Sequence, residues 1–193
     1  MSVRKLISTL ALMTFTASPM QSQAHLPRKS PEFSINKTSG DQILLSSLKG
    51  KVVVIEFMFV ASPHCLRLAE MLNKLQGDLS SRGFQSVAVA FGPNADQAMV
   101  GHVAEKLKLN YPVGYATSDQ VDAYLSRQGS EKLKIPQMVV VDRKGVIRAA
   151  TGGGADTRLE DEAALRSVVE SLLKETVPTT SPTPNAAASK SKN

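Results

Sequence analysis

The stretch that decides the fold is "LKGKVVVIEFMFVASPHC", at residues 48–65. Its middle, at 52–60, is an almost continuous apolar run rich in β-branched residues, which is typical of a parallel strand covered on both faces. Its end predicts a helix, because Ser62 is a suitable N-cap and Pro63 suits the first helical position. We therefore expect a buried strand that passes through a tight loop into a helix.

Strand and helix patterns alternate beyond this stretch. The turn "RKG" (143–145) joins an apolar run at 137–142 to "VIRAA" (146–150) and predicts an antiparallel hairpin. The alternation predicts an α/β fold, a three-layer sandwich whose mixed central sheet is flanked by helices. A short strand and turn are expected within 42–51, further strands at 84–91 and 111–116, and further helices at 95–109, 118–128 and 158–175.

The two ends of the chain have a different character. Residues 1–24 predict a secretory signal peptide, with two basic residues, a short apolar segment and a cleavage site after Ala24. An uncleaved membrane anchor is the alternative. We expect export to the periplasm or the extracellular space, with no stable membrane span after cleavage. The remaining segments are expected to be an N-terminal arm at 25–30, a folded domain at 31–175 and a disordered tail at 176–193, which has little to bury.

Charge and cysteine content limit the chemistry. The formal net charge is +6, but no cluster of Lys or Arg interleaves with aromatic residues, so the sequence does not predict a nucleic-acid surface. Cys65 is the sole cysteine of the sequence, and it has no partner for a disulfide within the chain. Any redox cycle would therefore need a thiol- or disulfide-bearing protein or a small thiol. No metal or other cofactor is expected.

Two stretches carry a resemblance to a known family. Residues 48–65 resemble the "L-KGK-VVLVNFWATWCxPC" segment of exported thiol–disulfide proteins with a thioredoxin fold, of the TlpA-like or redoxin (AhpC/TSA-type) kind. "KIPQMVVVDRKGVI", at 134–147, resembles their "GIPTTFLIDxxGxI" segment, in which the proline is cis. The resemblance implies that Ile135 and Pro136 form a loop that binds extended peptides. An ordinary proline at a strand entry is the alternative.

The resemblance also identifies what the site lacks. Ala61 stands where the family pattern has Trp, and Ser62 stands in place of the attacking Cys, whereas Cys65 matches the resolving Cys. A serine hydroxyl cannot form the mixed disulfide, so dithiol exchange by the usual route is not expected. We expect Cys65 to be the third residue of the helix, near the positive end of its dipole, which lowers a thiol pKa; a protonated His64 would add to this. A buried and inert Cys65 is the alternative.

Glu56 is an acidic residue in the middle of the apolar strand, six positions before Ser62. The resemblance implies a buried carboxyl beneath Cys65 that acts as its general base. Burial would raise the pKa of this carboxyl towards neutrality. A glutamate that reaches water or a lysine is the alternative.

Three functions remain open, and so does whether the chain is an enzyme. The first is a thioredoxin-like protein that uses Cys65 alone, for redox chemistry or partner binding. The second is a one-Cys peroxidase, since peroxiredoxins place Thr or Ser three residues before their cysteine. Against it, Met58 and Pro136 stand where that pattern requires Pro and Arg. The third is a binding module without catalysis.

Overall fold

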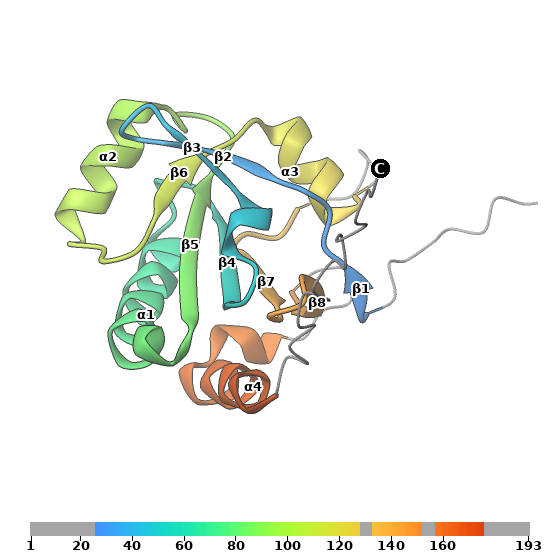
Figure 1. Cartoon of the computed structure of the whole chain (residues 1–193). Helices are drawn as coiled ribbons and strands as arrows, with labels where there is room; N and C mark the ends of the chain where they lie inside the picture. The colour runs from blue at the N-terminus through green and yellow to red at the C-terminus, as the bar shows by residue number, and fades with distance from the viewer. Residues whose placement is uncertain (1–25, 128–132, 152–156, 176–193) are drawn as a thin grey trace, which may run out of the picture.

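In the computed structural model, residues 26–127, 133–151 and 157–175 are described, and their strands form one mixed sheet (Figure 1). The predicted signal peptide and C-terminal tail lie outside these residues. The strand order is β1-β8-β7-β4-β5-β6-β2-β3. The strands are β1 (Arg28–Lys29), β2 (Ser34–Lys37), β3 (Gln42–Leu44), β4 (Val52–Met58), β5 (Phe84–Ala90), β6 (Val113–Tyr115), β7 (Gln137–Val141) and β8 (Val146–Ala150).

The centre of the sheet agrees with the prediction. β4, β5 and β6 are parallel, and β7 runs antiparallel beside β4. The predicted hairpin is confirmed, because β7 and β8 pair antiparallel with Val139 opposite Ala150. Two strands were not predicted: β1, within the expected arm, pairs with β8, and β2 lies between β6 and β3. Both are short and carry polar residues, so their sequences give no periodic signal.

The helices begin at side-chain caps. Ser62 caps α1 as predicted, and Thr117 forms a capping box with Gln120 at the start of α3. The single helix predicted at 158–175 is instead a 3₁₀ turn followed by α4, whose N-cap is Asp161. The helices are α1 (Pro63–Leu79), α2 (Gln97–Lys106), α3 (Ser118–Leu125) and α4 (Glu162–Lys174), with 3₁₀ turns η1 (Leu45–Leu48), η2 (Ser80–Arg82) and η3 (Thr157–Glu160).

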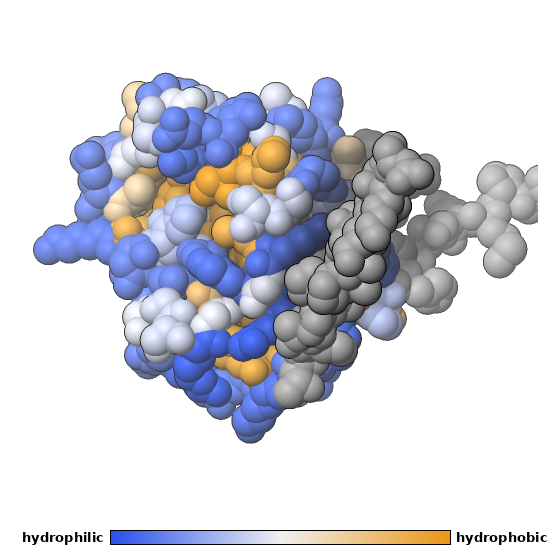
Figure 2. All heavy atoms as spheres, viewed as in Figure 1, coloured by the Kyte–Doolittle hydropathy of each residue, from blue (hydrophilic) through white to orange (hydrophobic). Residues whose placement is uncertain are grey.

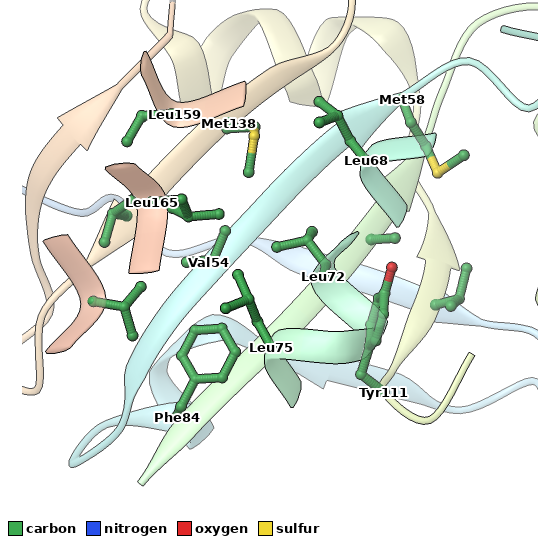
Figure 3. Packing of buried hydrophobic residues seen from close by; sticks show 14 of the residues in the cluster. Val54, Met58, Leu68, Leu72, Leu75, Phe84, Tyr111, Met138, Leu159 and Leu165 are labelled. Atoms are coloured by element: carbon green, nitrogen blue, oxygen red, sulfur yellow. The ribbon is translucent and has the colours of Figure 1, made fainter. Parts of the chain in front are cut away.

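Two apolar layers cover the two faces of the sheet. The alternation of side chains along β4 sends Val54 and Met58 to the layer that holds α1, α2 and α4, and Ile55 and Phe57 to the layer that holds α3. Figure 3 shows the first layer, in which Leu72 and Leu75 of α1 lie over Val54 and Phe84. Because both faces are covered, every residue of β4 is buried, as its apolar run predicts.

The surface is mainly polar on the face in Figure 2, where hydrophilic residues surround several smaller apolar patches. The large apolar side chains exposed among the described residues are Leu26, Leu44 and Met99, and they come from three different segments. Over the described ranges, no helix is both long and apolar enough to cross a membrane.

We expect Gly114→Ala to destabilise the domain by several kcal/mol, on the order of 3. A Cβ at Gly114 would lie 2.4 Å from the carbonyl oxygen of Asn36 in the neighbouring strand, and main-chain atoms cannot move aside without loss of the β2–β6 pairing. The change is measured as the free energy of unfolding in urea. Gly77→Ala is the matched control. It lies in α1 with no neighbour closer than 3.9 Å, and it should raise stability by up to about 1 kcal/mol. Equal effects of the two changes would contradict the close approach.

Candidate functional site

The site begins at the loop between β4 and α1. Ser62 is half-buried and extended, its N–H donates to the carbonyl of Phe59 at 3.0 Å, and its hydroxyl accepts from the N–H of Cys65 at 3.4 Å. Pro63 is the first residue of the helix, a position whose N–H makes no hydrogen bond within the helix, so the lack of an N–H in proline costs nothing there. Position 62 therefore lies on the outer side of the helix start, with Cys65 one turn further in.

Cys65 is fully buried in the layer that contains Met58, Leu68 and Met138. Burial raises the pKa of this thiol, while the Ser62 hydroxyl and the backbone of Phe59 lower it only in part. The charge of Glu56 raises it further. The expectation of a lowered thiol pKa is therefore wrong. The helix N-terminus favours a thiolate, but removal of the sulfur from water favours the thiol more strongly.

Glu56 lies two residues before the end of β4, between Ala88 of β5 and Met138 of β7. Strand alternation places its side chain on the same face as Val54 and Met58, which is the face that α1 and Cys65 cover. The residue is fully buried, and neither carboxyl oxygen has a hydrogen-bond partner among the described residues. Burial raises the pKa of Glu56 to about 8, so the predicted rise is confirmed and the carboxyl is mostly protonated at neutral pH.

Tyr111 is a third ionisable group of this region, and the sequence analysis missed it. Its ring is buried beside α1 (Figure 3), and its hydroxyl donates to the carbonyl of Ala69 at 3.1 Å. Burial and the charge of Glu56 both raise the pKa of Tyr111 far above its ordinary value. A tyrosine before a short strand looks like an ordinary core residue, so the sequence carried no signal of this proximity.

His64 makes a contact that the sequence did not predict. Its side chain is half-exposed, and Nε2 lies 3.2 Å from a carboxylate oxygen of Glu160 in η3. The pKa of Cys65 responds to its burial, to Ser62, Phe59 and Glu56 and to its own backbone, and an effect of a protonated His64 stays a prediction. His64 thus links the start of α1 to the segment before α4.

The bond between Ile135 and Pro136 is cis, as the resemblance implied. Gln137 pairs with Phe57, so the antiparallel register brings Pro136 level with Met58, at the end of β4 and beside the loop that carries Ser62. Pro136 is buried, and Ile135 packs against both apolar layers. The structure therefore brings Ser62, Cys65, Glu56 and the Ile135–Pro136 loop to one end of the sheet.

This region offers no obvious metal centre. In the described ranges, no three His, Cys, Asp or Glu side chains are grouped so that they could hold a metal ion. The groups that the described site brings together are the hydroxyl of the N-cap Ser62, the protonated thiol of Cys65 and the protonated carboxyl of Glu56.

Comparison with known families matches residues 27–150 to the AhpC/TSA family, a span that includes β4, α1 and the cis-proline loop. The chain belongs to the AhpC/TSA family. Curated relatives include the thiol-disulfide oxidoreductase ResA of Bacillus subtilis, which is 27% identical over 133 residues, or 68% of this chain and 70% of the relative. The ResA of Halalkalibacterium halodurans is 24% identical over 143 residues, or 73% of this chain and 77% of that one.

Solved structures agree with this membership. A thiol:disulfide interchange protein of the thioredoxin family from Chlorobium tepidum TLS is 25% identical, with a TM-score of 0.63, over 76% of this chain and 97% of that one. The thioredoxin domain of a thiol-disulfide oxidoreductase from Bacteroides vulgatus is 19% identical, with a TM-score of 0.59, over 74% and 96% of the two chains, and supports the fold. This AhpC/TSA chain therefore has the predicted thioredoxin-like α/β fold.

The buried carboxyl makes the stability of this AhpC/TSA chain depend on pH. Glu56 ionises near pH 4.5 in the unfolded chain but only near pH 8 in the folded one, so the folded state holds the extra proton between these values. The free energy of unfolding of the wild type should therefore fall as pH rises from about 4.5 to about 8, and then level off. The fall should be roughly 3–5 kcal/mol relative to Glu56→Gln, which has no proton to lose. Urea titrations at several pH values measure it. Parallel curves for the two proteins would show that Glu56 is not buried.

Cys65 should resist alkylation in the folded protein. We expect iodoacetamide at neutral pH to react at least about a hundredfold more slowly with the native chain than with the chain in urea, because the sulfur is exposed only on local opening. Mass spectrometry follows the reaction. Ser62→Cys/Cys65→Ala is the matched control, with a half-buried thiol at the outer position that should react quickly. A native rate close to that of the control would contradict the sealed thiol.

Proposed function

We propose that the chain is an exported thioredoxin-like protein that binds thiol- or disulfide-bearing partners at the Ser62 and Pro136 loops and does not carry out dithiol exchange. One observation carries the proposal. Ser62 occupies the half-buried N-cap where the family pattern has its attacking Cys, while the thiol of Cys65 is sealed behind it. Chemistry at Cys65 would require the helix start to open.

The two loops that would bind a partner, at Pro136 and at Phe59–Ser62, keep their backbone geometry without a second cysteine. The cis bond before Pro136 and the loop from Phe59 to Ser62 lie next to each other at the end of β4 and β7. An extended peptide that lies across these two loops would bind through main-chain hydrogen bonds, and its side chains would add specificity. Replacement of a thiol by a hydroxyl at position 62 removes the reaction but leaves this backbone geometry in place.

The class of partner follows from the relatives. The ResA proteins and the Chlorobium tepidum protein are described as thiol-disulfide proteins, and this chain covers more than two thirds of the matched lengths. We infer that a polypeptide with a thiol or disulfide is the partner, and that the predicted signal peptide at 1–24 places the encounter outside the cytoplasm.

A peroxidase is less well supported. A peroxide-reactive cysteine needs a thiolate that peroxide can reach. Cys65 is fully buried and its pKa is raised. The spacing of Ser62 and Cys65 matches the peroxiredoxin pattern, but a sealed and protonated thiol does not supply the thiolate that this second function requires.

The proposal predicts that one substitution creates activity. Ser62→Cys places a thiol at the helix N-terminus, three residues before Cys65, and should make the chain reduce insulin disulfides in the presence of dithiothreitol, where the wild type shows no rate above background. The turbidity of reduced insulin chains measures the rate.

Two further variants test whether the new activity requires both a thiol at position 62 and Cys65. Ser62→Ala should remain inactive, and Ser62→Cys/Cys65→Ala should form mixed disulfides that it cannot release. An active wild type would contradict the absence of dithiol exchange. A folded but inactive Ser62→Cys chain would contradict the claim that the site still accepts disulfide-bearing polypeptides.

A further inference from the structure

The sheet has a second feature at the same end as Ser62. The helices that follow β5 and β6 lie on opposite faces, because Val100 and Val103 of α2 pack with α1 whereas Val121 and Tyr124 of α3 pack in the other layer. The loops after β5 and β6 therefore diverge. In open α/β sheets, a crevice beyond the carboxyl ends of the strands at such a switch point is the usual place for a ligand.

A hollow of about 490 Å³ lies at this divergence and is open to solvent. A volume between roughly 300 and 1,000 Å³ is typical of ligand sites. No lining residue is charged: the lining consists of small apolar side chains together with hydroxyl, phenol and amide groups. The lining residues are Asn36, Gly92, Pro93, Ala95, Tyr115, Ala116, Thr117 and Ser118.

The hollow is joined to the Ser62 loop by a close contact. Gly92 has φ +77°, and a Cβ there would lie 2.9 Å from the ring of Phe59. Phe59 also packs against Phe91, with ring centroids 4.9 Å apart, and its carbonyl accepts the N–H of Ser62. One wall of the hollow thus rests on the residue that holds Ser62. The Pro136 loop lies on the other side of β4, since β7 and β5 flank that strand.

The spacing of the strands determines how many residues of a bound peptide separate the Ser62 loop from the hollow. Neighbouring strands are about 4.8 Å apart, so the divergence between β5 and β6 lies about 7 Å from the end of β4. An extended chain rises about 3.3 Å per residue, and about two residues cover this distance. A segment that crosses the Pro136 and Ser62 loops would therefore bring a later or earlier side chain over the hollow.

From this juxtaposition we propose that the hollow is a specificity subsite for an uncharged side chain of the partner, two or three residues from the one that faces Ser62. The inference rests on the proposed function, because the partner must first lie across the Ser62 loop. An aromatic side chain fits best, since the small apolar residues pack against a ring, and the Asn36 amide N–H and the Ser118 hydroxyl belong to the lining, whereas the Thr117 hydroxyl is engaged with Gln120. A charged side chain would lose water without gaining a counter-charge from the lining.

The test uses Ser62→Cys/Cys65→Ala in the full chain, which presents one thiol at position 62. The probes are seven-residue peptides of Gly and Ala with a central Cys, which is activated as a disulfide with 5-thio-2-nitrobenzoate. The protein thiolate attacks the peptide sulfur, a protein–peptide disulfide forms, and the same 5-thio-2-nitrobenzoate leaves as a coloured anion. Tyr, Asp or Lys is placed two or three positions to either side of the Cys. We expect Tyr on one side to give a rate constant roughly tenfold higher than Asp or Lys at the same position.

Filling the hollow should remove this preference. Ser118 is exposed and lines the hollow, so Ser118→Trp added to the trapping variant should reduce the advantage of Tyr to less than about threefold. Ala123→Trp is the matched control, since Ala123 is an exposed residue of the same helix outside the lining, and the preference should persist. Circular dichroism confirms that both variants are folded.

The outcomes distinguish the two proposals. Peptide capture that is faster than that of activated free cysteine, but equal for Tyr, Asp and Lys at every position, overturns the subsite and leaves the proposed function intact. Preference that survives Ser118→Trp in a folded chain also overturns the subsite. Capture of every peptide no faster than that of activated free cysteine overturns the proposed function, and the subsite with it.

Discussion

The site depends on the burial of a carboxyl and a thiol on one face of β4. The pleat of the strand fixes the face on which Glu56 lies, because Val54 and Met58, two residues before and after it, belong to the layer beneath α1. A charge there would have neither water nor a described hydrogen-bond partner. Each group therefore favours its protonated form, and an ionised Glu56 would raise the pKa of Cys65 further. The fold tolerates this carboxyl and this thiol in its core because both are mostly uncharged near neutral pH.

This arrangement explains why the loss of an attacking thiol leaves the architecture intact. Position 62 is an N-cap at the boundary of the layer, and a hydroxyl there accepts a bond from the N–H of Cys65. The bond is long, so its contribution to stability is towards the lower end of the range for caps, about 0.5 kcal/mol. β4, the start of α1 and the cis-proline loop are held by the sheet register and by apolar packing. None of these contacts requires sulfur at position 62.

Local patterns in the sequence predicted much of this. The β-branched runs at 52–60 and 84–91 predicted the two central strands, Ser62 and Pro63 predicted the start of α1, and the family resemblance predicted the cis bond at Pro136. The roles of the site residues in binding or catalysis remain predictions. The predictions that failed concerned contacts between residues far apart in the sequence. The sign of the Cys65 pKa shift depends on how completely other elements cover the sulfur, and the partner of His64 is Glu160, far along the chain. β1 and β2 acquire their structure from their neighbours, since segments so short have no periodicity to recognise.

The hollow beyond β5 and β6 also depends on distant segments. α3 forms one of its walls, and a helix of eight residues is not stable alone. Residues at the start of the described chain hold it in place: a guanidinium nitrogen of Arg28 donates to the carbonyl of Tyr124 at 3.0 Å, and Phe33 packs against the Tyr124 ring with centroids 5.0 Å apart. Ser30 adds a hydrogen bond to the Tyr124 hydroxyl. The segment that precedes β2 therefore does more than lead into the domain. It holds α3 on the face opposite α2, and the crevice beside the Ser62 loop lies where the loops that lead to these two helices diverge.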